Sequence, residues 1–168
     1  MSIVAKQAEP DRPIRFGTVT PVQKDAAAIM SLRIVLANEV VFAFMAQGFH
    51  WNVTGPDFPQ LHDLFGDIYE DVFGAVDPTA ENIRKLGGEA PFMLTDYARL
   101  TTVDQVATPV DAPGMVRALM AANAQVNQSI LDAFAVVNDL NEQGIADFLA
   151  ARDDMHKKWA WMLRETAG

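Results

Sequence analysis

Four long stretches of helical periodicity dominate this chain and leave little room for any other architecture. In residues 22–50 the apolar side chains recur at three- and four-residue spacing and cover more than one face of the expected helix. Residues 58–86 repeat the pattern, and similar periodicity extends over residues 111–137 and 145–163. No alternation long enough for a β-strand separates them. We therefore predict an all-α fold, a four-helix bundle whose long helices share one core.

Turn and capping residues mark where these helices begin and end. Gly87 and Gly88, with Pro91 shortly after, are typical of a helix C-terminus. Asp111 and Pro113 have the types favoured at a helix start. The second and third long helices are therefore separate, and the chain between them is long.

That connection, residues 89–111, is rich in Pro, Thr and Asp, and we predict one short helix in it at about Leu94–Leu100. A bundle with a long crossover between the second and third helices fits this order. We assign residues 1–21 to an N-terminal tail and residues 22–168 to the bundle domain.

Composition narrows the class of protein. The 168 residues suffice for one domain, and 50% hydrophobic with 21% charged residues is typical of a soluble globular protein. Cysteine is absent, which excludes disulfides and thiolate metal sites. The uncharged run from Val40 to Pro56 contains Gln47, His50 and Asn52, so we predict no membrane span. With no apolar leader at the N-terminus, we predict a cytoplasmic protein.

The formal net charge of −9 argues against a general affinity for nucleic acid, because phosphate binding needs clustered cations. The first 24 residues form a weak basic arm at best, with acidic residues among Lys6, Arg12, Arg15 and Lys24. We therefore predict that any binding to DNA is weak.

Two of the three histidines, His50 and His62, flank a Gly-Pro turn and lie twelve residues apart. Asp77 and Glu81, further along the second predicted helix, are four residues apart and share a face. Two imidazoles and two carboxylates suit Fe(II) or Zn(II), and iron accepts the more oxygen-rich arrangement. These four residues are our candidate metal ligands.

Distance decides how such a site could form. His62 and Asp77 are separated by roughly 22 Å along a straight helix, whereas donors to one ion lie no more than about 4 Å from each other. If the four residues make one site, two subunits share it across a twofold axis. An intra-bundle site of the Glu-x-x-His type is disfavoured, because Gln47, Pro59 and Asp153 precede the histidines by three residues.

The motifs "HWNVTGPDFPQLH", "DPTAENIRKLGGEAP" and "HKKWAWMLR" resemble the Dps family, the DNA-protecting mini-ferritins of bacteria, from about Val22 to Arg164. The resemblance implies a ferritin-like bundle that assembles into a hollow shell of twelve subunits. It implies ferroxidase sites at twofold interfaces, where Fe(II) is oxidised, preferentially by hydrogen peroxide, and stored as ferric oxide. By position the catalytic and metal-binding residues match His50, His62, Asp77 and Glu81.

The chain departs from the family at Gly66, where an acidic ligand usually follows the second histidine by four residues. Asp67 lies about 100° further round the helix and Asp63 is one step past His62, so neither replaces it simply. We predict weaker iron binding, or a water, a shifted Asp67 or another metal, such as zinc, in its place.

Pro78 raises an alternative for Asp77. Inside a helix, proline removes a backbone donor and crowds the preceding turn, which costs about 3 kcal/mol or more. The second helix could therefore bend there, or a new helix could begin at Pro78 with Asp77 as its cap. In that case backbone amides, and not a metal, would occupy the Asp77 carboxylate.

Other polar and aromatic residues have less specific roles. His156 and Trp161 match the family's C-terminal motif, outside its usual ligands, and we expect His156 to be a buried or interface hydrogen-bonding residue. We expect Trp51 and Trp159 to pack, although Trp51 lies close to the proposed iron. Asp147 either lines an iron-admitting pore, as the resemblance implies, or lies on a solvated turn.

Two functions remain at this stage. The first is an iron-sequestering mini-ferritin with ferroxidase activity. The alternative is a Dps-like cage with lost or weakened oxidation, which serves as a structural, zinc-binding or DNA-associated particle.

Overall fold

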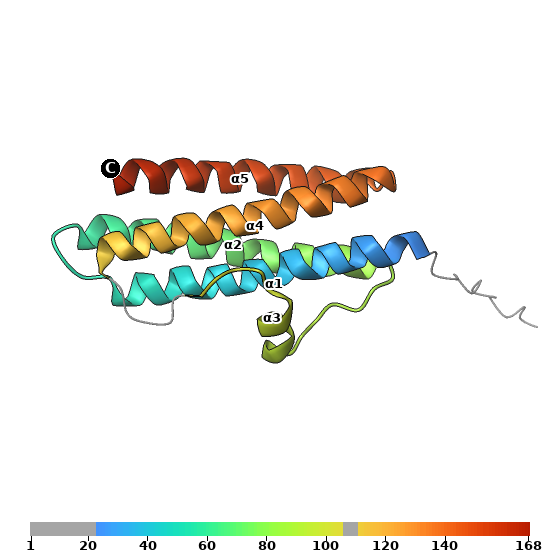
Figure 1. Cartoon of the computed structure of the whole chain (residues 1–168), viewed down its shortest axis with the longest axis horizontal. Coiled ribbons are helices and arrows are strands. Elements are labelled where there is room, and N and C mark those ends of the chain that lie inside the picture. Colours follow the sequence, from blue (N-terminus) through green and yellow to red (C-terminus); the bar gives the residue numbers. More distant parts are fainter. Residues whose placement is uncertain (1–22, 106–110) are drawn as a thin grey trace, which may run out of the picture.

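The computed structural model describes residues 23–105 and 111–168, and over those residues it contains five helices and no strand. Four long helices lie side by side and one short helix lies on the crossover (Figure 1). Their bounds are α1 Gln23–Asn52, α2 Phe58–Lys85, α3 Leu94–Leu100, α4 Ala112–Asp139 and α5 Gln143–Ala167. The all-α bundle, the long crossover and the short helix are confirmed; the tail at residues 1–21 lies outside the described residues.

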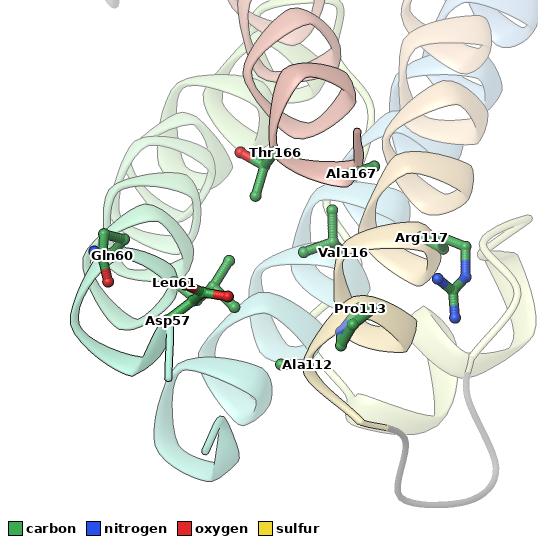
Figure 2. Close-up of a pocket in the computed structure, with 9 residues that line it drawn as sticks. All are labelled: Asp57, Gln60, Leu61, Ala112, Pro113, Val116, Arg117, Thr166 and Ala167. Carbon is green, nitrogen blue, oxygen red and sulfur yellow. The ribbon is translucent and has the colours of Figure 1, made fainter. Parts of the chain in front are cut away.

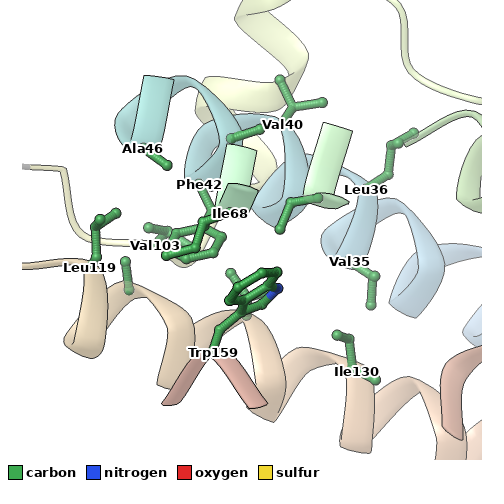
Figure 3. Close-up of a cluster of buried hydrophobic side chains, with 14 of the residues drawn as sticks. Val35, Leu36, Val40, Phe42, Ala46, Ile68, Val103, Leu119, Ile130 and Trp159 are labelled. Carbon is green, nitrogen blue, oxygen red and sulfur yellow. The ribbon is translucent and has the colours of Figure 1, made fainter. Parts of the chain in front are cut away.

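Helix α1 is the centre of the bundle, and it packs against α2, α3 and α4, while α4 packs against α5. Leu32, Leu36 and Phe42 on α1 are fully buried. By length and composition the stretch Ala26–Asn52 could cross a membrane, but its most apolar window is 56% buried by the other helices. Its apolar character is therefore explained by its place in the core, to which all four long helices contribute side chains (Figure 3).

The helix ends match the sequence signals. After α2, Gly87 adopts a φ of 78°, and the Gly88 amide donates to the Ile83 carbonyl at 3.0 Å, so the last turn is closed. At the start of α4, Asp111 Oδ1 accepts from the Gly114 amide at 2.9 Å.

The crossover is fastened to α1 by one buried side chain. Asn38 Oδ1 accepts from the Thr101 hydroxyl at 2.9 Å and from the Thr102 amide at 2.8 Å. Asn38 Nδ2 donates to the Thr102 hydroxyl at 3.0 Å. The crossover runs back along the bundle, and α4 starts at the end where α2 starts (Figure 1).

Helix α2 runs without interruption through Pro78. The alternative in which Asp77 caps a new helix is therefore wrong, because Asp77 lies inside α2. The carbonyl that loses its partner to Pro78 belongs to Gly74, an exposed residue where water can bond to it. Ala75 and Ile83, buried on either side of Pro78, hold α2 in the core across the defect.

Candidate metal centre

His50 and His62 meet where α1 ends and α2 begins. His50 Nδ1 donates to the His62 carbonyl oxygen at 2.7 Å, and His62 Nδ1 donates to the His50 carbonyl oxygen at 2.8 Å. A carbonyl can only accept, so each Nδ1 carries the proton and each Nε2 has a free lone pair. Metal-binding histidines are commonly oriented by a second bond of this kind. The chain therefore holds both imidazoles in a ligand-ready tautomer.

The two rings are stacked, with centroids 3.6 Å apart and planes inclined by 22°. Because the two ring planes are nearly parallel, the two Nε2 atoms do not point at one common position within a metal–nitrogen bond of about 2.0–2.1 Å. The pair is therefore better suited to two neighbouring ions, with one Nε2 bound to each, than to one shared ion. Phe58 packs against the His62 ring at 5.1 Å and Tyr69 against the edge of the His50 ring at 5.3 Å, which fixes the stack from both sides.

Gly66 lies directly beneath the His50 ring. A Cβ placed on Gly66 would lie 3.3 Å from His50 Nδ1 and 3.4 Å from its Cε1. An acidic side chain at this position would therefore need the imidazole to shift while Nδ1 remains bonded to the backbone. Asp63 and Asp67 are both exposed, whereas Gly66 is buried. The His50 ring thus packs against the position where the family's carboxylate would begin.

Asp77 and Glu81 are exposed one turn apart on α2. Among the residues that the structure describes, no three His, Asp or Glu side chains are grouped as metal ligands. The structure thus brings His50 and His62 together, and it does not bring the two carboxylates to them within one chain. Each chain therefore carries two candidate half-sites, the imidazole pair and the carboxylate pair.

Large aromatic side chains are exposed on the two helices that carry these half-sites. Phe44 is 55% and Trp51 66% exposed on α1, and Phe73 is 60% exposed on α2. The expected packing of Trp51 is not met within one chain, because it lies at the last turn of α1 beyond the core. These side chains are on the same two helices as the candidate ligands.

The bundle interior contains a polar cluster that the sequence patterns did not predict. Arg152 on α5 donates to both carboxylate oxygens of Asp71 on α2, at 3.0 and 2.9 Å, and Trp159 Nε1 donates to one of them at 2.8 Å. Burial raises the pKa of Asp71, but these hydrogen bonds outweigh it and lower the pKa overall. The two charged residues are 81 positions apart, so no local spacing could reveal them.

His156, in the same interior, is fully buried, as expected of a hydrogen-bonding residue. Its Nδ1 donates to Asn123 Oδ1 at 2.8 Å, and Asn123 Nδ2 donates to the His156 carbonyl at 2.9 Å. Burial, assisted by the Arg152 charge, lowers the pKa of His156 to about 3, so the ring is neutral. Trp161 is 54% exposed, and Trp159 packs in the core as predicted.

A cleft of about 370 Å³ opens at one end of the bundle (Figure 2). The start of α2, the start of α4 and the end of α5 form its walls, with Leu61, Val116 and Thr166 among the lining residues. None of the four candidate ligands lines it, so it is separate from the metal centre.

The comparisons with known proteins agree with this fold. The ferritin-like domain model matches residues 29–168. A low temperature-induced protein of Nostoc sp. is 34% identical over 77% of this chain and 73% of its own length. The DNA protection during starvation protein of Brevibacillus brevis is 27% identical over 86% of this chain and 95% of its own length.

Solved structures give the same result. The crystal structure of a Dps protein from Bacillus brevis superposes with a TM-score of 0.85 at 25% identity, over 89% of this chain and 100% of that one. Dps from Thermosynechococcus elongatus shares the fold, with a TM-score of 0.84 at 24% identity over 86% and 92% of the two chains. With its bundle, its crossover and its matching domain, the chain belongs to the Dps family of ferritin-like proteins.

Proposed function

We propose that this protein is an iron-storing mini-ferritin. It oxidises Fe(II), preferentially with hydrogen peroxide, at sites shared between subunits, and it stores the ferric product inside a cytoplasmic shell of twelve chains. The observation that carries this proposal is the reciprocal bonding of His50 and His62, which leaves two Nε2 lone pairs free at the surface of one chain. Family membership supports the same role.

In the proposed site, His50 and His62 of one subunit face Asp77 and Glu81 of its neighbour. The imidazoles bind Fe(II), and the carboxylates compensate its charge. Two-metal sites hold their ions about 3.5–4 Å apart, and the 3.6 Å ring stack matches that spacing. A pair of Fe(II) ions delivers two electrons together. The O–O bond of peroxide then breaks to give, with two protons, two molecules of water and no hydroxyl radical.

Gly66 sets the limit of this site. Without the acidic side chain, the site has one negative charge fewer for its cations, so we expect weaker Fe(II) binding than in a site that has it. Asp147, exposed near the start of α5, is our candidate for the acidic pore through which Fe(II) enters.

Subunit mixing tests the shared site. A His50→Ala/His62→Ala protein and an Asp77→Asn/Glu81→Gln protein are each expected to be inactive in Fe(II) oxidation by peroxide. When the two are unfolded together and reassembled, each mixed twofold interface regains one intact site out of two. Random mixing therefore restores about a quarter of the wild-type sites. No recovery in mixed assemblies, with both parents assembling normally, would refute a shared site.

The alternative is a cage that has lost oxidation and acts as a structural, zinc-binding or DNA-associated particle. The packing of His50 over Gly66 favours it, since that ring leaves little room for a third ligand. Anaerobic Fe(II) titration followed by peroxide separates the two functions, because the alternative predicts oxidation no faster than in buffer. A gel shift at physiological salt, with and without residues 1–20, tests DNA binding, which we expect to be weak.

A further inference from the structure

Four buried polar residues converge inside the bundle without satisfying one another. Glu39 on α1, Thr79 on α2, and Arg152 and His156 on α5 are all buried. Five of their polar atoms have no hydrogen-bond partner within the described part of the chain: Glu39 Oε1 and Oε2, Thr79 Oγ1, Arg152 Nε and His156 Nε2. Buried polar groups in proteins are nearly always bonded either to protein or to ordered water.

These residues form one cluster. The Thr79 hydroxyl, as a hydrogen-bonding neighbour, and the Arg152 charge both lower the pKa of Glu39, although neither contact has the length and angle of an ordinary hydrogen bond. Phe42, one turn after Glu39, packs against the His156 ring at 6.0 Å. Because Arg152 acts on both Glu39 and His156, the unpartnered atoms from α1, α2 and α5 belong to one region of the bundle interior.

The chemistry of these atoms is that of a water site. Arg152 Nε and the Thr79 hydroxyl donate, while His156 Nε2 accepts, because its Nδ1 carries the proton given to Asn123. Water donates and accepts equally well and bridges such sets. A metal ion fits poorly, since Arg152 already places a fixed positive charge there, and the described residues offer no three grouped His, Asp or Glu ligands.

We propose that the interior of the bundle is a binding site for ordered water, in which water molecules join Glu39 and Thr79 to Arg152 and His156. This site is separate from the candidate metal centre and does not depend on it.

The charges around Glu39 support this assignment. Burial raises the pKa of Glu39 to about 7, and Thr79 and Arg152 only partly offset that rise. The remaining charge that acts on it is Asp71 on α2, which raises its pKa and is itself paired with Arg152. His156 on α5, with its lowered pKa, and its partner Asn123 on α4 add no charge. An un-ionised Glu39 adds a hydroxyl donor, which a bridging water can accept.

A high-resolution crystal structure of the full chain tests the site directly. The expected result is at least one water within hydrogen-bonding distance of a Glu39 oxygen and of either Arg152 Nε or His156 Nε2. A dry interior, direct bonds between these side chains, or anomalous scattering from a metal at this position would each overturn the proposal.

Infrared difference spectra of wild type and Glu39→Gln give a second readout. The wild type at pH 6 should show the carbonyl band of a hydrogen-bonded carboxylic acid, and Glu39→Gln should lack it. The melting temperature of the wild type relative to Glu39→Gln should fall from pH 5 to pH 8, because the folded chain gives up the Glu39 proton later than the unfolded chain. A Glu39 band already ionised at pH 6, or one at the frequency of a carbonyl without a hydrogen bond, would contradict the water-bridged acid.

Discussion

The histidines of this protein occupy two contrasting environments. His50 and His62, at the α1–α2 junction, bond through Nδ1 to each other's backbone carbonyls and keep Nε2 accessible. His156, inside the bundle, bonds through Nδ1 to Asn123, and its Nε2 is enclosed beside the Arg152–Asp71 pair. All three rings are fixed in the same tautomer. What separates a candidate ligand from a structural residue is where the remaining nitrogen points.

The difference also concerns charge. The outer pair lies near the surface, where a cation can approach and partner carboxylates can be supplied by another chain. The interior already contains its own cation, Arg152, which donates two bonds to Asp71. An arginine in the middle of the bundle stabilises a carboxylate there without any metal, and it leaves the outer pair as the candidate for iron chemistry.

Acid titration of the interior histidine should give the largest effect. The pKa of His156 is lowered to about 3 by burial, against 6.5 for a free ring. Over this range the unfolded chain binds a proton on His156 and the folded chain does not. The free energy of unfolding therefore rises with pH between about 3 and 6.5. The full contribution is about 5 kcal/mol. Urea unfolding of wild type and His156→Gln from pH 4 to pH 7 measures most of it, about 3 kcal/mol. Parallel pH profiles for the two proteins would contradict a neutral buried His156.

Breaking the interior ion pair should cost less. Arg152→Met leaves the Asp71 carboxylate without its charge partner, and we expect a loss of about 3 kcal/mol in the free energy of unfolding, because Asp71 is partly exposed. Arg152→Met/Asp71→Asn, which removes both charges, should recover most of that loss. Urea denaturation at pH 7 checks both variants. A double variant as unstable as Arg152→Met would show that packing, not charge, dominates here.

Adding a methyl group beneath the His50 ring tests whether the packing of that ring matters for metal binding. Gly66→Ala places Cβ 3.3 Å from His50 Nδ1, which forces the ring to shift by a few tenths of an ångström. We expect Fe(II) binding to weaken about tenfold, the lower end of the range for disturbing a ligand's supporting contacts. Anaerobic Fe(II) titration measures the change.

Gly74→Ala is the matched control, because a Cβ there meets nothing within 4 Å. It should leave Fe(II) binding unchanged and stabilise α2 by about 0.5–1 kcal/mol. Equal loss of Fe(II) binding in both glycine variants would point to α2 as a whole and not to the His50 ring.

The smallest effect is expected at Asp67, the residue beside the missing ligand. It is exposed while its neighbour Gly66 is buried beneath His50. We expect Asp67→Ala to change the initial rate of Fe(II) oxidation by less than about twofold, since a surface carboxylate contributes only a screened charge. A rate reduced tenfold or more would identify Asp67 as the carboxylate that replaces the family's ligand.

Local patterns were sufficient for most of the fold. The Gly87-Gly88 stop and the Asp111 cap depend on neighbouring residues only, and the structure confirms both. At Pro78 the local pattern left two alternatives open, and only the one with a new helix capped by Asp77 is wrong, because α2 is continuous there and buried on both sides of the proline. The Arg152–Asp71 pair joins positions far apart in the sequence, and no local spacing predicts such a contact.

For the candidate site too, some features could be predicted from the sequence and others could not. The spacing of His50 and His62 was visible in the sequence, and the rod-like geometry of α2 already excluded a site within one chain. The orientation of the rings was not, because it depends on two backbone carbonyls and on the space above Gly66. Sequence spacing can thus indicate a candidate ligand but cannot assign its tautomer.

The glycine beneath the imidazole also bears on how this lineage could change. An acidic residue at position 66 would place its first carbon 3.3 Å from Nδ1 of His50, in a ring whose Nδ1 is held by the carbonyl of His62. A carboxylate at this position therefore needs a shift of the His50 ring by a few tenths of an ångström, so its steric cost is borne by one of the two imidazoles it would assist. Asp77 and Glu81 are exposed on α2 and lie away from this contact, so substitutions there meet no such steric cost.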